Sequence, residues 1–345
     1  MENPPSPEKK KNIGKELIFH LLKLAIAGIL IYWVIKDIDL ETLRTIPGKR
    51  LFFAWGACLF MIFCQVSFTA LRWKLLLEAQ ELNITFFRAF TLTLQGMFFS
   101  LCLPGGAVGG DVVKAAVLAK ETKEGKKLEG VTSIFADRLS GMIALFGLTL
   151  LLTLLSLQKI LTFSGEVKAA VFTLSLFCCV GIGGAFFLLF HDLILRISFI
   201  NRIVEWGDKL VRGRLKRVLS SVDLYRKKWK TFLLSCLMGV TVIHPFLLLG
   251  LLFAAMILTG GGADGDPLGI FLASGHGNVA SCIPGSIGGL GVRDKIMQLL
   301  LEYAGLLKSD AALSPLIYSL SYVTISLTGA IFFLGDSFRK KGVKK

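Results

Sequence analysis

Residues 99–114 read FSLCLPGGAVGGDVVK, and residues 279–295 read VASCIPGSIGGLGVRDK. Both stretches contain Cys, then Leu or Ile, then Pro-Gly, followed by a small residue and a pair of glycines. A basic residue comes soon afterwards, Lys114 in the first stretch and Arg293 in the second. Proline removes a backbone donor and glycine permits dihedral angles that other residues avoid. Each stretch therefore predicts a break in a helix, and we expect the two breaks to form one site.

The composition is that of a polytopic membrane protein. The chain has 345 residues, 54% of them hydrophobic, with a mean hydropathy of +0.67. Apolar runs of about 20 residues, the length that crosses a bilayer, recur along it. The net charge of +15 is explained by basic cytoplasmic loops and anionic lipid, so we expect no nucleic-acid partner. Seven cysteines lie in hydrophobic segments without zinc-like spacing, so we expect no metal site.

The apolar runs predict an all-α integral membrane fold with about six spanning helices. Two further segments, 86–118 and 268–305, contain the two breaks. The six predicted spans are residues 17–35, 51–71, 131–156, 167–190, 231–258 and 311–335.

The distribution of basic residues decides whether the two segments with breaks cross the membrane. If both enter and return on the same side, 28 of the 39 Lys and Arg residues face the cytoplasm and 7 face outward. If 86–103 crossed instead, 16 of the cytoplasmic charges would move outside, against the preference for positive loops inside. The sequence therefore predicts two re-entrant hairpins, with both termini in the cytoplasm.

This topology makes the chain an inverted repeat within a single membrane domain, 1–345. The first repeat is 51–156 with its break at 103–111, and the second is 231–335 with its break at 283–291. Secondary transporters commonly have this architecture. Residues 191–230 are basic and amphipathic. They fit a cytoplasmic helix lying on the inner leaflet and equally a connector with solvated charges.

The breaks are where we expect a ligand. Helices should restart at 111–120 and at 292–304, with their N-termini pointing toward the membrane interior. Free N–H groups and the helix dipole make such ends favourable for anions, and Lys114 and Arg293 add positive charge. Asp111 is a candidate N-cap. Asp294 is a candidate partner of Arg293 or a carboxylate linked to proton binding.

Several ionisable or polar residues lie within apolar segments. Asp137 and Arg138 begin the span 131–156, and we interpret them as functional, because the Asp137 side chain should fall near the first break. The alternative places both in the cytoplasmic headgroup zone. His276 and Asn278 precede the second break. A structural hydrogen-bonding role is favoured for His276 over a titrating one.

The motifs LPGGAVGGDVVK, ADRLSG at 136–141 and IPGSIGGLGVRD resemble the flippase-like transmembrane domain of lysylphosphatidylglycerol synthases and of stand-alone proteins that share it. The resemblance covers nearly the whole chain and implies an inner-membrane protein that binds or translocates a charged lipid. Two positions differ: Lys114 stands where arginine is usual, and Asp294 where glutamate is usual. Lysine lacks the bidentate fork of arginine. The predicted lipid- or anion-binding residues are Pro104, Gly105, Gly106, Gly109, Gly110, Asp111, Lys114, Asp137, Arg138, Pro284, Gly285, Gly288, Gly289, Gly291, Arg293 and Asp294.

We therefore expect a flippase or transporter that moves an anionic lipid, either a phospholipid or a polyprenyl-phosphate-type lipid, between leaflets. An integral-membrane transferase acting on a lipid-linked sugar or a phospholipid headgroup is the alternative. It would need clustered carboxylates or a metal, whereas Asp111, Asp137 and Asp294 are isolated in the sequence. A subunit that positions other envelope proteins is a third possibility. The sequence has no GxxxxGK(S/T) motif and no aminoacyl-transfer domain, so we expect no cofactor, no catalytic residue and no synthesis of lysyl-lipid.

Overall fold

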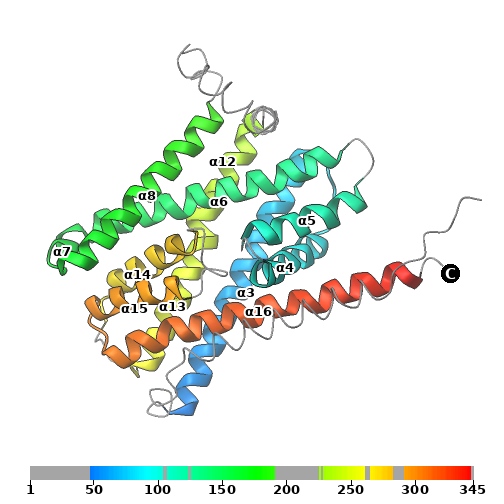
Figure 1. The fold of residues 1–345 in the computed structure, drawn as a ribbon. Helices are drawn as coiled ribbons and strands as arrows, with labels where there is room; N and C mark the ends of the chain where they lie inside the picture. The colour runs from blue at the N-terminus through cyan, green and yellow to red at the C-terminus, as the bar shows by residue number, and fades with distance from the viewer. Residues whose placement is uncertain are drawn as a thin grey trace, which may run out of the picture. The chain divides into compact units, whose positions relative to one another are not determined.

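The structure is a computed structural model that describes residues 47–103, 107–122, 126–190, 225–226, 228–260, 265–282 and 291–342, with side chains as far as Asp336. All of these residues belong to one compact unit, Leu40–Lys345. Over these ranges the chain forms helices and no strand (Figure 1). The expected all-α membrane fold is confirmed.

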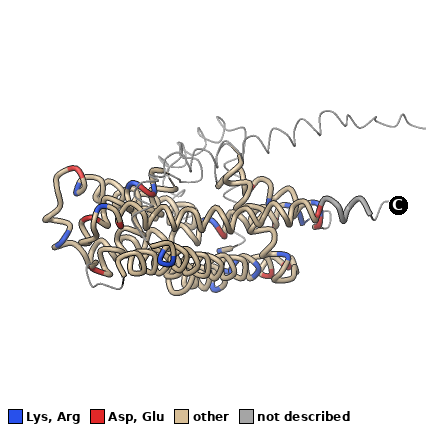
Figure 2. The backbone as a smooth tube through the Cα atoms, turned by 90° about the horizontal axis from the view of Figure 1, so that it is seen from below, with Lys and Arg blue, Asp and Glu red and all other residues tan. Residues whose placement is uncertain are grey.

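Five helical segments in the described ranges are long and apolar enough to span a membrane. Each of them matches a predicted span to within a few residues at most boundaries; the sixth prediction, 17–35, lies outside the described residues. Figure 2 shows that most charged positions lie toward the ends of these helices and that few lie between. The five segments are α3 (Gly48–Ala79), α6 (Lys127–Leu155), α8 (Gly165–Leu189), the run Trp229–Leu258 and α16 (Lys308–Gly342).

The run Trp229–Leu258 is one apolar segment with an irregular turn in its middle. It consists of α12 (Trp229–Met238), the π-helical turn η1 (Gly239–Ile243) and α13 (His244–Leu258). Pro245 is the second residue of α13, two residues after the π turn ends. Because proline has no N–H, it interrupts the regular ladder of hydrogen bonds at this point.

The first break separates two helices that lie side by side, α4 (Phe86–Cys102) and α5 (Ala107–Glu121) (Figure 1). Gly110 allows the close approach: a Cβ atom there would lie 2.1 Å from the carbonyl oxygen of Gly96. The helix resumes at Ala107, earlier than the expected residue 111. The interruption is therefore shorter than predicted, and its residues 104–106 lie outside the described part of the chain.

The second break likewise separates two helices that pack on each other, α14 (Pro267–Ala280) and α15 (Val292–Tyr303). Gly277 of α14 faces the Met297 side chain of α15. Gly291 precedes α15 with a φ of 85°, which favours glycine. The restart expected near 292 is found there, while residues 283–290 lie outside the described ranges.

The two halves of the chain contact each other in matching ways. The first long helix of one half packs on that of the other, α3 on α13. The first arm of each hairpin packs on the last long helix of the opposite half, α4 on α16 and α14 on α6. The α4–α16 contact is close, because a Cβ atom at Gly329 would lie 2.1 Å from the Leu94 carbonyl oxygen. Re-entry of the hairpins into the membrane stays a prediction.

The remaining described helices flank this arrangement. α8 packs along α6, and the short α7 (Leu157–Leu161) joins them. Of the predicted basic connector 191–230, residues 191–224 lie outside the described ranges, and Trp229 already begins α12. The largest apolar core lies among α3, α13, α14, α15 and α16, with Tyr318 fully buried in it.

Candidate functional site

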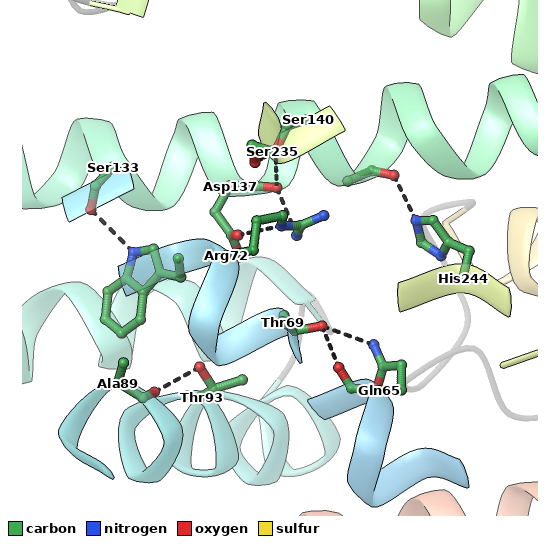
Figure 3. Close-up of polar contacts among 12 residues, drawn as sticks. Gln65, Thr69, Arg72, Ala89, Thr93, Ser133, Asp137, Ser140, Ser235 and His244 are labelled. Carbon is green, nitrogen blue, oxygen red and sulfur yellow. Dashed lines mark hydrogen bonds and ion pairs between the residues drawn. The ribbon is translucent and has the colours of Figure 1, made fainter. Parts of the chain in front are cut away.

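Asp137 of α6 is paired with Arg72 of α3. Arg72 Nε lies 2.9 Å from Asp137 Oδ1, and Arg72 Nη2 donates to the backbone carbonyl of Asp137 at 3.1 Å (Figure 3). Both residues are buried, with 4% and 5% of their surfaces exposed. Gly141 leaves room for the guanidinium, because a Cβ atom there would lie 3.0 Å from Nη2. Two charged groups are thus held together inside spanning helices.

Two polar atoms beside this pair are buried without a hydrogen-bond partner among the described residues, Arg72 Nη1 and His244 Nδ1. His244 Nε2 lies 3.0 Å from the carbonyl oxygen of Gly141, so Nε2 carries the hydrogen and Nδ1 has a free lone pair. Figure 3 shows the end of Arg72 turned toward the side on which His244 lies. Such a donor and acceptor are commonly satisfied by an internal water.

Arg138 points to a different helix from its neighbour Asp137. Its Nε and Nη2 atoms donate to the two carboxylate oxygens of Asp111 on α5, both at 2.7 Å. The pair is partly accessible, with 47% of the Arg138 side chain and 20% of the Asp111 side chain exposed. The expectation that Asp111 is an N-cap is wrong, because α5 begins at Ala107 and Asp111 lies in its second turn.

Lys114 is a buried cation without an opposite charge of its own. It lies one turn after Asp111, is 5% exposed, and places Nζ 3.5 Å from the ring centroid of Trp73. The Trp73 indole is fixed by a 3.1 Å hydrogen bond from Nε1 to Ser133 Oγ. Lys114 makes no hydrogen bond or ion pair with any described residue. A ring face attracts an ammonium group but satisfies none of its three donors.

We call Arg72, Asp111, Lys114, Asp137 and Arg138 the Lys114 cluster. The charges of the other four residues all act on Lys114. Three helices supply the cluster: α3, α5 and α6. The two arginines are matched by the two aspartates, so Lys114 leaves the cluster with one positive charge in excess.

The second half of the chain has its own buried arginine. Arg293, the second residue of α15, is 3% exposed. Its Nη2 donates to Ser319 Oγ, its Nε lies 3.4 Å from Asp294 Oδ1, and its Cζ lies 5.1 and 5.5 Å from the ring centroids of Tyr318 and Tyr322. The expected partnership of Arg293 and Asp294 is therefore present, and α16 completes it.

Asp294 also closes the start of α15. Its Oδ2 accepts from the backbone N–H of Gly291 at 3.2 Å. Tyr322 of α16 interacts electrostatically with both Arg293 and Arg138. Arg138 interacts in the same way with Cys282, where the second break begins. Charged groups beside the first break thus lie near residues beside the second.

The position of Lys114 differs from the expectation in one respect. We expected both basic residues within the first turn of their helices, which holds for Arg293. Lys114 is the eighth residue of α5, so it lies two turns from the helix end. Its positive charge therefore acts separately from the N–H groups at that end.

The predicted residues divide into four groups. Asp111, Lys114, Asp137 and Arg138 lie together, and Arg293 with Asp294 lies in the second half. Gly110 and Gly291 have backbone roles, and Gly109 belongs to α5. The remaining predictions lie outside the described residues: Pro104, Gly105, Gly106, Pro284, Gly285, Gly288 and Gly289.

His276 has the structural role that we favoured. Nδ1 lies 3.1 Å from the Leu272 carbonyl oxygen, and Nε2 lies 3.4 Å from both Thr153 Oγ1 and Ser175 Oγ. Asn278 Oδ1 accepts from Tyr318 Oη at 3.4 Å. These contacts join α14 to α6, α8 and α16. In the part of the chain that the structure describes, no three His, Cys, Asp or Glu side chains gather as a metal site requires.

Sequence reasoning missed Arg72, Trp73, Tyr318 and Tyr322. The predicted span 51–71 ended one residue before Arg72. The apolar positions continue with Leu75, Leu76 and Leu77, and α3 continues with them to Ala79. That run was the available signal. The two tyrosines gave no signal, because aromatic residues are common in apolar helices.

Comparison with known proteins agrees with the motifs. A family model described as the lysylphosphatidylglycerol synthase TM region matches residues 20–329. The chain belongs to this family. The UPF0104 membrane protein PH1989 of Pyrococcus horikoshii is 21% identical over 130 residues, which cover 37% of this chain and 37% of the relative. No solved structure matches.

Membership of the lysylphosphatidylglycerol synthase TM region family, together with the five apolar helices, identifies a multi-pass membrane protein of a lipid-related family. The resemblance inferred from the three motifs is confirmed. The Lys114 cluster lies within the matched residues, and so does the Arg293 group, by which we mean Arg293 with its contacts Asp294, Tyr318, Ser319 and Tyr322.

Proposed function

We propose that this protein is a lipid flippase that moves a phosphate-bearing anionic lipid between the two leaflets of the inner membrane. The observation that carries the proposal is Lys114, a buried ammonium group with no carboxylate of its own. A buried charge is costly unless it is paired. A phosphate group that enters from the bilayer would supply the missing negative partner. Membership of a lipid-related family favours a lipid headgroup as the source of that phosphate.

The second support is the matched packing of the two halves. The hairpin α4–α5 packs against α16, and the hairpin α14–α15 packs against α6, in each case the last long helix of the opposite half. We propose that the halves are inverted repeats, that the hairpins re-enter the membrane from opposite sides, and that both termini are cytoplasmic. In transporters of this kind the substrate site lies where the repeats meet, near the middle of the bilayer.

Arg138 and Arg293 lie in different halves, and we propose that they contact the lipid headgroup at opposite ends of its path. Arg138 has an accessible edge in the first half, and Arg293 lies on the second hairpin. Tyr322 interacts with both. A headgroup that leaves Lys114 and Arg138 would contact the Arg293 group next. The phosphate would then stay close to positively charged side chains and would not enter the hydrocarbon core alone.

Lipid movement in reconstituted vesicles tests the proposal. Fluorescent phosphatidylglycerol and fluorescent phosphatidylcholine are compared in vesicles with wild type, Lys114→Met and Arg293→Gln. Lys120→Met is the matched control, because Lys120 is an exposed lysine on the same helix. We expect wild type and the control to accelerate exchange of phosphatidylglycerol, and both site variants to lose most of that acceleration.

Two results would contradict the flippase proposal. The first is a folded wild-type protein that moves neither lipid. The second is movement that survives both site variants unchanged, which would place the path elsewhere in the molecule. Thermal unfolding of each purified variant shows whether a loss of movement comes from a loss of fold.

A further inference from the structure

We propose that the substrate headgroup is a phosphodiester with a single negative charge, as in a glycerophospholipid, and that phosphomonoester and diphosphate lipids are disfavoured. The inference rests on the proposed function, because it assumes that a lipid phosphate binds at the Lys114 cluster. Beyond the proposed function, it specifies how many negative charges the bound headgroup carries.

The argument begins with the charge balance around Lys114. Arg72 is matched by Asp137 at 2.9 Å, and Arg138 by Asp111 at 2.7 Å. These four charges, two positive and two negative, all act on Lys114. Lys114 itself remains unmatched. The surplus in the described cluster is one positive charge.

The two breaks and the Arg293–Asp294 pair do not change this count. The first break, residues 104–106, and the second break, residues 283–290, contain no ionisable side chain. In the second half, Arg293 is matched by Asp294. The surplus of one charge therefore holds for the Lys114 cluster and the Arg293–Asp294 pair taken together.

Because the cluster is buried, its net charge discriminates between headgroups of different charge. Lys114, Arg72 and Asp137 are each at most 5% exposed, so water and salt screen their charges weakly. A ligand with one negative charge would neutralise the cluster. A phosphomonoester carries about 1.5 to 2 negative charges at neutral pH and would leave a buried excess. A zwitterionic headgroup brings a cation that the cluster has no free carboxylate to receive.

The site also has an entrance. Arg138 is the accessible member of the cluster, with 47% of its side chain exposed. It can turn one N–H edge to a phosphate oxygen while its other edge holds Asp111. The Lys114 ammonium, with three donors and only the Trp73 ring beside it, would take the remaining oxygens.

Equilibrium binding to the detergent-solubilised protein tests the charge rule without requiring transport. The probes are dioctanoyl phosphatidylglycerol, dioctanoyl phosphatidate and dioctanoyl phosphatidylcholine, which share their acyl chains. At pH 7 they carry one negative charge, about 1.5 to 2 negative charges, and no net charge. We expect wild type to bind phosphatidylglycerol most tightly of the three.

Two variants move the count in opposite directions. Lys114→Met removes the surplus, and should weaken phosphatidylglycerol binding about 10- to 100-fold, to the level of phosphatidylcholine. Asp111→Asn raises the surplus to two, and should make phosphatidate the preferred ligand. Lys114→Arg keeps the charge and should keep the wild-type order of preference. Lys120→Met serves as the control for a lysine lost elsewhere on α5.

The charge rule is overturned if wild type prefers phosphatidate or phosphatidylcholine, or if Asp111→Asn leaves the ratio of phosphatidate to phosphatidylglycerol unchanged. If Lys114→Met does not fold, the Asp111→Asn ratio decides alone. Charge-dependent binding without lipid movement would sustain this inference and refute the flippase. Lipid movement without charge-dependent binding would support the flippase and refute the charge rule.

Discussion

Arg72 and Asp137 are 65 residues apart in the sequence, yet their Nε and Oδ1 atoms lie 2.9 Å apart in the interior of the helix bundle. The pair fixes α3 to α6 at the level of the Lys114 cluster. Because the two charges match each other, neither contributes to the surplus that Lys114 brings to the cluster. The pair is therefore part of the charge count on which the proposed selectivity depends.

Removing one member of this pair should destabilise the protein strongly. Arg72→Met leaves the Asp137 carboxylate buried and unmatched, and we expect a loss of about 3–5 kcal/mol in the free energy of unfolding. The double variant Arg72→Met/Asp137→Leu should recover most of that loss, because no charge is left uncompensated. Chemical unfolding in detergent measures the cycle.

Lys126→Met is the control for the buried pair, because Lys126 forms an exposed ion pair with Glu81. We expect no measurable change in stability from it. A double variant as unstable as the sum of its single variants would show that Arg72 and Asp137 do not depend on each other.

Gly110→Ala should disrupt the first hairpin. A Cβ atom at residue 110 would lie 2.1 Å from both the Gly96 carbonyl oxygen and Ser100 Oγ, so α4 and α5 must separate. Overpacking of this kind costs about 1–3 kcal/mol, which a lowered thermal midpoint would show. Gly147→Ala in α6 is the control, because nothing lies within 4 Å of its added Cβ atom. Equal midpoints for the two variants would contradict the close packing.

Much of the fold follows from the sequence, and the partners of the charged residues do not. Apolar runs of about 20 residues give the spans, because the bilayer fixes their length. The glycine and proline motif placed the restart of α15 correctly. Asp137 and Arg138 were recognised as unusual, but their adjacency in sequence gave no sign that they face α3 and α5 separately.

The reason is that a helix turns about 100° per residue, so neighbouring side chains point in different directions. Which helix each one meets depends on packing between segments distant in sequence. Arg72 could be identified as a partner of Asp137 only once α3 was placed beside α6. The fold class was therefore predictable, and the charge balance was not.

Arg293→Lys should impair lipid movement although the charge is kept. Lysine cannot donate to Ser319 and Asp294 with the two edges of a planar group, nor stack on Tyr318 and Tyr322 in the same way. We expect about a tenfold slower exchange of phosphatidylglycerol, the effect of losing one charged hydrogen bond. Tyr322→Phe keeps the ring and should retain most activity. Wild-type exchange in Arg293→Lys would mean that only the charge of residue 293 matters.

Asp266 should give the protein a pH-dependent contribution to stability at the start of α14. Its carboxylate accepts from the amides of Leu268 and Gly269 at 3.0 and 3.1 Å, and from Lys159 Nζ at 3.0 Å. Burial raises the pKa of Asp266, but the hydrogen bonds from Lys159 and Leu268 outweigh it, so the pKa lies below the usual 3.8.

A carboxylate whose pKa is lower in the folded state stabilises the fold above the unfolded-state pKa, and the contribution is lost as pH falls through the folded-state pKa. At pH 7, Asp266→Asn should therefore unfold more easily than wild type, by roughly 0.5–1 kcal/mol for a partly exposed cap. The difference should shrink below pH 3.8. In a Lys159→Met background, the difference in stability that Asp266→Asn causes should be smaller at pH 7, because one of the hydrogen bonds to the carboxylate is removed. A difference that is the same at pH 7 and pH 3 would mean that the cap acts through its shape and not through its charge.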